Sequence, residues 1–197
     1  MWWVELLNTI TAILDAGAGG GGGSYESIAT ATGTGSSATI TFSSIPSTYQ
    51  HLQIRAIMKS NSSSSIDYRT FQFNGDTGAN YAFHQLYGDG SSAGATGSAS
   101  QNRIGSGVSG GLLVPGSDAS VINMTGTVII DIHDYASNSK YKTVRFVTGS
   151  DRNGSGRIIL FSGLWMSTNP ITSIQFSAGS DSWTTATVFS LYGIRGA

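Results

Sequence analysis

The segment QHLQIRAIM, Gln50–Met58, carries the alternation that decides the fold of this chain. Every second residue from Leu52 to Met58 is apolar, and the residues between them include Gln53 and Arg55. A period of two residues is typical of a strand with one face against a core and the other face turned away from it. The sequence therefore predicts a half-buried strand here.

Thr125–His133 shows the same pattern, with Val128, Ile130 and Ile132 on one face. These two runs are the longest clean alternations, so we expect them at the centre of a sheet. Shorter alternating runs, separated by turn residues, predict seven further strands at 25–32, 37–42, 67–73, 141–148, 157–166, 171–177 and 187–194. Regularly spaced short strands indicate an all-β protein, an antiparallel β-sandwich of jelly-roll-like type.

Three stretches between these runs have weaker signals. Gly33–Ser36 is rich in turn residues and predicts a hairpin between the first two strands. Asn80–Tyr87 fits either a helical turn or a strand, and both readings stay open. Gly88–Ser117 is rich in Gly and Ser, so we expect a long loop, pinned to the body by Leu112–Val114.

The first 16 residues have a different, helical period. Trp3, Leu6, Ile10 and Ile13 are spaced three, four and three apart, which places them on one stripe of a helix. A helix this short is only marginally stable alone in water, so we expect residues 1–16 to form a docking helix that contacts a partner. The expected docking residues are Trp2, Trp3, Leu6, Leu7, Ile10, Ile13 and Leu14.

A secretion signal or a membrane span explains this segment less well. No Lys or Arg precedes Arg55, and a span needs about 20 apolar residues, so we expect no membrane insertion. Isoleucine at both Ile10 and Ile13 favours a three-stranded bundle, hence a homotrimer. Insertion into a groove on a larger assembly is the alternative.

A glycine-rich linker separates this segment from the strands. Residues 17–23 hold six Gly in seven positions, which is typical of a flexible coil. We therefore divide the chain into a docking helix at 1–16, a linker at 17–24 and a β-sandwich domain at 25–197.

Composition argues against several function classes. Charged residues make up 11% of the 197 residues and the net charge is −1, which gives no field to attract nucleic acid. The chain has no Cys, so it forms no disulfide and no thiolate site. The cations Lys140 and Lys142 are expected on one solvated strand face.

We find no pattern that predicts catalysis, a metal or a cofactor. His51, His84 and His133 lie far apart in sequence and are expected to be structural. Asn74–Asp76 and Gly88–Gly90 are expected to be turns rather than calcium ligands. The chain is therefore predicted not to be an enzyme, with no catalytic residue, no metal ligand and no cofactor.

Aromatic residues near turns and strand ends are the remaining candidates for binding. Aromatic side chains that are exposed on a β-sandwich can stack on sugar rings or anchor a protein contact. The surface or glycan contacts predicted on this basis are Tyr81, Tyr87 and Trp183.

Five segments resemble a recurrent domain in virion proteins of tailed bacteriophages. They are YESIATATGTGSSATITFSSIPSTYQHLQIRAI (Tyr25–Ile57), FNGDTGANYAFHQLYGDGSS (Phe73–Ser92), KYKTVRFVTGSD (Lys140–Asp151), SGLWMSTNPITSIQF (Ser162–Phe176) and FSLYGIRG (Phe189–Gly196). Proteins of this kind are usually labelled tail-fibre or structural proteins, and a short apolar start followed by Gly also looks like theirs. The resemblance carries no catalytic residues.

The resemblance implies a bacteriophage virion structural protein that displays its sandwich outward as a tail-fibre or host-contact component. Its expected partners are other virion proteins of the tail, baseplate or capsid, and a host surface glycan. The alternatives are a capsid decoration or head-fibre protein that stabilises the virion, and a stand-alone glycan-binding module.

Overall fold

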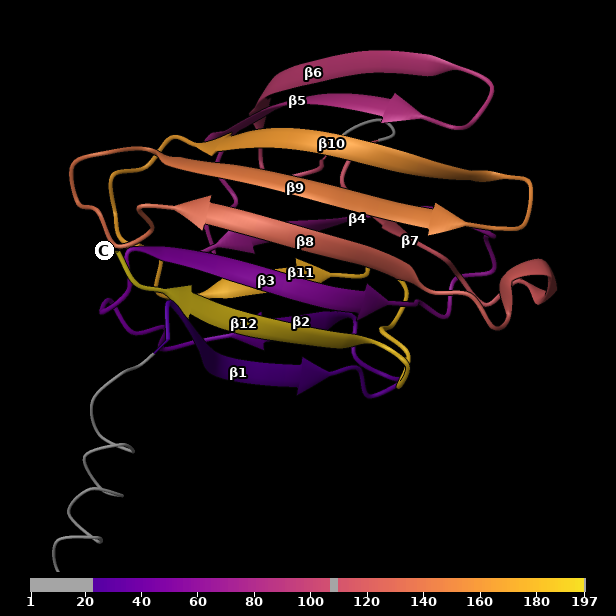
Figure 1. Cartoon of the computed structure of the whole chain (residues 1–197), viewed down its shortest axis with the longest axis horizontal. Coiled ribbons are helices and arrows are strands. Elements are labelled where there is room, and N and C mark those ends of the chain that lie inside the picture. The colour runs from indigo at the N-terminus through magenta and orange to yellow at the C-terminus, as the bar shows by residue number, and fades with distance from the viewer. Residues whose placement is uncertain (1–22, 107–109, 197) are drawn as a thin grey trace, which may run out of the picture.

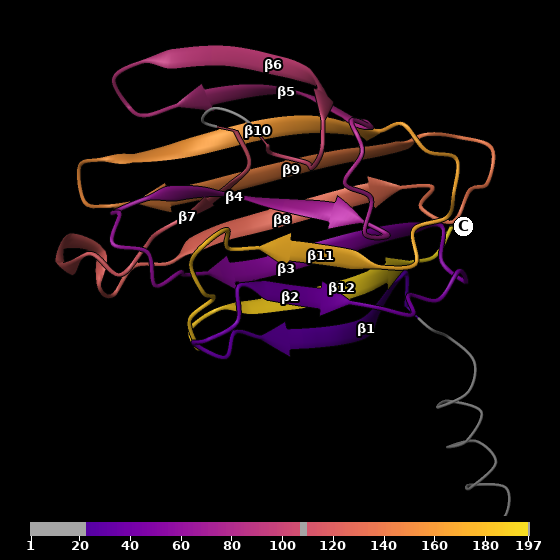
Figure 2. The same ribbon diagram turned by 180° about the vertical axis from the view of Figure 1, so that it is seen from behind.

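The computed structural model describes residues 23–106 and 110–196, which form a sandwich of two antiparallel sheets (Figures 1 and 2). The elements are β1 (Tyr25–Thr32), β2 (Thr39–Phe42), β3 (His51–Met58), β4 (Asp67–Phe73), β5 (Tyr81–Gly88), β6 (Ala93–Gln101), β7 (Leu112–Val114), the 3₁₀ helix η1 (Ala119–Val121), β8 (Gly126–His133), β9 (Lys142–Asp151), β10 (Gly156–Trp165), β11 (Ile174–Ser177) and β12 (Val188–Ile194).

The two sheets are unequal in size. The large sheet has eight strands in the order β1-β12-β3-β8-β9-β10-β5-β6, and the small sheet has four in the order β2-β11-β4-β7. The large sheet lies in front in Figure 1 and the small sheet lies in front in Figure 2. The predicted all-β antiparallel sandwich is confirmed, whereas the helix predicted over residues 1–16 lies outside the described residues.

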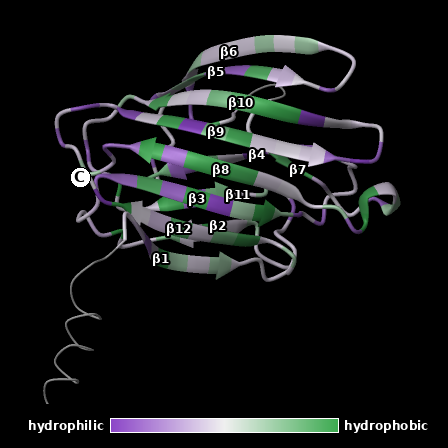
Figure 3. Ribbon diagram, in the orientation of Figure 1, coloured by the Kyte–Doolittle hydropathy of each residue, from purple (hydrophilic) through white to green (hydrophobic). Residues whose placement is uncertain are grey.

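The alternation read from the sequence faces the core as expected. Leu52, Ile54 and Met58 are fully buried on β3, and Ile130 and Ile132 are fully buried on β8. The two strands pair directly inside the large sheet, so the predicted central position of these runs is confirmed. Hydrophobic bands also recur along the strands of this sheet in Figure 3.

A continuous string of aromatic rings joins the two sheets across the core. In order, the rings are Phe83 (β5), Phe161 (β10), Phe146 (β9), Phe71 (β4), Phe176 (β11) and Phe189 (β12), with neighbouring centroids 4.2 to 6.1 Å apart. The string begins and ends in the large sheet and crosses the small sheet between. Phe71 and Phe176 therefore lie where the sheets are held together.

The expected hairpin at Gly33–Ser36 is wrong, because this segment crosses between the sheets. β1 pairs with β12 in the large sheet, and β2 pairs with β11 in the small sheet. The Gly33 N–H donates to the Thr187 carbonyl, and a Cβ on Gly33 would lie 2.1 Å from the Thr184 carbonyl oxygen. The turn glycine is thus required by close approach of another chain segment.

The expected long loop over Gly88–Ser117 is also wrong in part. It contains β6, which pairs along β5, and β7, which pairs with β4. Of the two alternatives left open for Asn80–Tyr87, a helical turn and a strand, the structure has the strand, β5. The role foreseen for Leu112–Val114 is confirmed, since all three residues are fully buried. β6 was missed because its residues are mainly Ala, Gly and Ser, which give no hydrophobic alternation.

Lys142 is buried and does not share a solvated face with Lys140. Its ammonium donates to the carbonyls of Lys140, Ser167 and Thr168 at 2.7, 3.4 and 3.2 Å. Burial lowers the pKa of this side chain. Hydrogen bonds to three carbonyls replace the lost hydration, so a lysine here fastens the loop after β10.

Replacing Phe71 by Ala should lower the free energy of unfolding by about 3–5 kcal/mol, because it opens a cavity at the crossing of the aromatic string. Urea denaturation followed by tryptophan fluorescence measures the loss. Thr41→Ala, on the exposed face of the small sheet, is the control and should change stability by less than about 0.5 kcal/mol. Equal effects of the two changes would contradict the role given to Phe71.

Candidate functional site on the outer face of the large sheet

The face of the large sheet that points away from the core carries a row of exposed apolar side chains. Ile129 pairs with Val147, Val147 with Leu160, and Leu160 with Leu86, so the four lie side by side across β8, β9, β10 and β5. The exposed fraction of each of these four residues lies between 45% and 58%. We call these four residues the apolar row. Contiguous apolar surface of this kind marks an interaction site more often than single exposed residues do.

A polar row runs parallel to it, two residues further along the same strands. Its members are Gln53, Asp131, Arg145, Ser162 and His84, each in register with the next. The Gln53 side-chain amide donates to Asp131 Oδ1 at 2.8 Å, and Arg55 Nε donates to Gln53 Oε1 at 2.9 Å. The outer face is therefore amphipathic across the strands.

A shallow groove of about 510 Å³ lies where the two rows approach β6. Its outer-face lining includes His84, Leu86, Ala95, Arg145, Leu160 and Ser162. The apolar wall comes from the apolar row and the polar wall from the polar row. The groove can therefore accommodate an apolar side chain of a binding partner on one wall and polar groups of that partner on the other.

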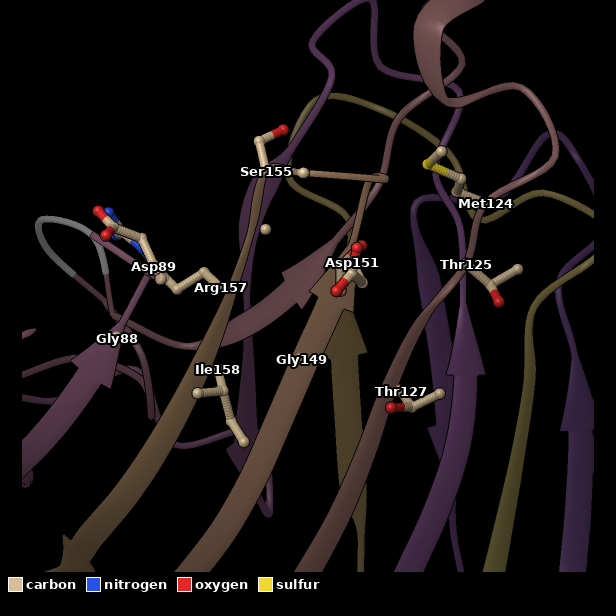
Figure 4. Close-up of a pocket in the computed structure, with 14 residues that line it drawn as sticks. Gly88, Asp89, Met124, Thr125, Thr127, Gly149, Asp151, Ser155, Arg157 and Ile158 are labelled. Carbon is tan, nitrogen blue, oxygen red and sulfur yellow. The ribbon is translucent and has the colours of Figure 1, made fainter. Parts of the chain in front are cut away.

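A second hollow, of about 780 Å³, opens over Gly149 (Figure 4). Gly149 lies between Thr127 on β8 and Ile158 on β10, and all three belong to the outer face. Figure 4 shows the Thr127 and Ile158 side chains on either side of the bare Gly149 backbone. We call this the glycine hollow. Gly149 has no side chain and so leaves the floor of the hollow open, and Met124 and the turns near Asp89 and Ser155 contribute to its walls.

The charged groups beside the glycine hollow are already engaged within the chain. The Arg157 guanidinium lies 4.7 Å from the Tyr87 ring centroid and hydrogen-bonds to the Tyr68 hydroxyl. Asp89 accepts N–H bonds from Ser91 and Ser92, which lower its pKa, and the nearby charge of Arg157 lowers it further. Because these charged groups are held in contacts that stabilise the ends of the loops, the hollow would select a partner mainly by its shape.

Two of the three histidines come together at the opposite end of the strands. The His51 and His133 ring centroids are 5.1 Å apart, and His51 Nδ1 accepts the Asp134 N–H at 3.0 Å. Burial lowers the pKa of His133, and the neighbouring His51 and Arg145 lower it further. Within residues 23–106 and 110–196, no group of three His, Asp or Glu side chains is placed to hold a metal ion.

Two of the three aromatic residues predicted at the surface are buried, and that prediction is wrong for them. Tyr81 and Trp183 are 0% exposed. The Tyr81 hydroxyl accepts the Phe73 N–H at 3.1 Å, and burial raises the pKa of Tyr81 to about 12. The Trp183 and Phe189 ring centroids are 5.4 Å apart in an edge-on arrangement. The polar loop around Trp183 folds inward, and the Trp183 N–H donates to the Ser37 carbonyl.

Tyr87 is only partly exposed. The Arg157 guanidinium lies over its ring, and a Cβ added to Gly94 would lie 2.5 Å from its ring atoms. Both the cation and the β6 backbone therefore restrict stacking on a sugar. The seven expected docking residues between Trp2 and Leu14 lie outside the described residues.

The two Asp-Gly segments are turns, as expected. Asp76 accepts bonds from the Gly78 N–H, from the Asn80 amide and, at 2.7 Å, from the Trp165 indole. Burial acts to raise the pKa of Asp76, but the bonds from Trp165, Asn80 and Gly78 outweigh it and hold the pKa below its usual value. The Asp76 carboxylate thus ties the turn to β10.

Asp76→Ala should cost about 1–3 kcal/mol of stability at neutral pH, because the Trp165 indole loses its acceptor. Since the folded state lowers the Asp76 pKa, this contribution is present above the unfolded pKa and fades as pH falls through the folded pKa. The difference from the wild type should therefore shrink below about pH 4. Urea denaturation at several pH values measures it, with the exposed Asp151→Ala as control; a difference that does not change with pH would contradict this account.

The apolar row was missed at the sequence level, although a signal was present. Val128–Ile130, Phe146–Val147 and Ile158–Phe161 are contiguous apolar runs in strands that otherwise alternate. In each run, at least one residue must face away from the core. Only the register, however, shows that these residues meet on neighbouring strands.

Comparison with known proteins gives no assignment. No protein-family model matches the chain, and neither a curated protein nor a solved structure matches it. Among the described residues, no helix is long and apolar enough to cross a membrane.

Proposed function

We propose that this chain is a structural protein of a tailed-bacteriophage particle, joined to the particle through residues 1–16 and displaying the β-sandwich outward. It acts in this proposal as a tail-fibre or host-contact component. The observation that supports the proposal furthest is the apolar row, because an exposed apolar surface suits a chain that assembles with other protein surfaces, a second copy of itself included.

The position of the chain ends supports a display arrangement. Tyr25 pairs with Ile194, and the Arg195 N–H donates to the Ser24 carbonyl at 3.1 Å, so both ends of the described domain leave the sandwich at one end. The glycine hollow and the turns 89–92 and 152–155 lie at the other end of the large sheet. A sandwich attached by its first residues would point these turns away from the attachment point.

A capsid decoration role remains the alternative within this proposal, and copy number separates the two. A copy number per particle comparable to that of the capsid protein favours capsid decoration, and a small copy number favours a place in the tail. The glycan-binding alternative loses its support from Tyr81 and Trp183, which are buried.

Deleting residues 2–23 should leave a folded sandwich that no longer joins particles, because the deletion removes the proposed docking helix and most of the linker while leaving both sheets intact. Mass spectrometry of purified particles measures incorporation, and circular dichroism checks the fold. Deleting only Gly20–Gly22 is the matched control and should leave incorporation unchanged. Full incorporation of the chain without residues 2–23 would overturn the proposed attachment.

A further inference from the structure

We propose that two copies of this chain associate through the outer faces of their large sheets. The two-fold axis runs parallel to the strands, between β9 and β10, and the two sheets face each other at the spacing of about 10 Å usual for packed sheets. This inference uses only the described residues and does not depend on the virion proposal.

The first support is that, under this symmetry, the apolar row of one copy lies directly against the apolar row of the other. The axis exchanges β9 with β10 and β8 with β5, because β8-β9-β10-β5 are consecutive in the sheet. Val147 of each copy then faces Leu160 of the other, and Ile129 faces Leu86. The four exposed side chains of each row are removed from water together, which favours association.

The second support is a knob and a hole on the same surface. Ile158 is 59% exposed and pairs directly with Gly149, which has no side chain. Because the axis lies between these two residues, Ile158 of each copy faces the glycine hollow of the other. The fit is reciprocal, as a two-fold interface requires.

The third support is the charge pattern of the polar row. The same axis places Asp131 opposite His84 of the second copy, and Arg145 opposite Ser162. No residues of like charge lie directly opposite each other in this row. The arrangement therefore avoids the repulsion that would oppose self-association.

The size of the shared surface is also sufficient. The overlap covers the six strands β3-β8-β9-β10-β5-β6. At about 4.8 Å between strands and about 26 Å of strand length, this face measures about 750 Å² per copy. Stable interfaces bury about 800 Å² per partner. A second copy is favoured over an unrelated protein because knob, hole and apolar row complement one another on a single surface.

The test is the mass of the full-length chain and of two variants, measured by light scattering or sedimentation. Leu160→Arg puts a charge into the apolar row, and Gly149→Leu puts a side chain on the floor of the glycine hollow, where Ile158 of the second copy would lie. A Cβ on Gly149 would lie 3.4 Å from its nearest neighbour, the Arg157 carbonyl oxygen, so the monomer should tolerate the change. We expect the wild type to be a dimer or an even multiple, and each variant to have half its mass.

Ile122→Arg is the matched control, since Ile122 is 64% exposed but lies beside η1 rather than on a strand of the large sheet. It should leave the mass unchanged, and thermal denaturation should show all variants folded. A wild-type monomer at about 100 μM would overturn the proposal, because a standard interface should form well below that concentration. So would an oligomer whose mass neither variant changes. Particle incorporation is a separate measurement, so failure here and failure of the virion proposal are distinguishable.

Discussion

The structure depends on the packing of aromatic rings between two sheets of unequal size. Phe71 and Phe176 supply the small sheet's part of the ring string, and Phe146 on β9 and Phe189 on β12 meet them from the large sheet. A four-stranded sheet can cover only part of an eight-stranded one. β5 and β6 extend the large sheet past the small sheet (Figure 1), and the segment that carries Ile104 and Gly110 packs against Gly163 of β10 and Phe83 of β5. The broad outer face of the sandwich follows from this inequality.

Much of the fold could be predicted because its strands alternate in the usual way. β3 and β8 were placed correctly at the sheet interior, since their buried residues recur at every second position. The strands that were missed had other signals. β6 is held by backbone pairing and has almost no apolar residue, and β7 is three residues long. The turn at Gly33 looked like a hairpin because composition does not show which sheet the next strand will join.

The candidate site was harder to predict than the fold. Tyr81 and Trp183 lie near turns, where exposure is common, but one provides a buried hydroxyl for the backbone and the other fills the space beside Phe189. The apolar row depends on the register of four strands, and register depends on the whole chain. Gly149 has the least distinctive sequence signal of all, because its contribution is the side chain that it lacks.

The pairing of the outermost strands has a consequence for biosynthesis. Of the described strands, β1 and β2 are synthesised first, and they pair with β12 and β11, which are synthesised last. No local contact can complete either sheet while the chain is still emerging, and closure of such long loops slows folding. During synthesis, the backbone N–H and C=O groups of β1 and β2 therefore have no strand partner until β12 and β11 have been made. Ser, Thr and Ala supply five of the eight residues of β1, which would keep that nascent strand soluble until its partner is made.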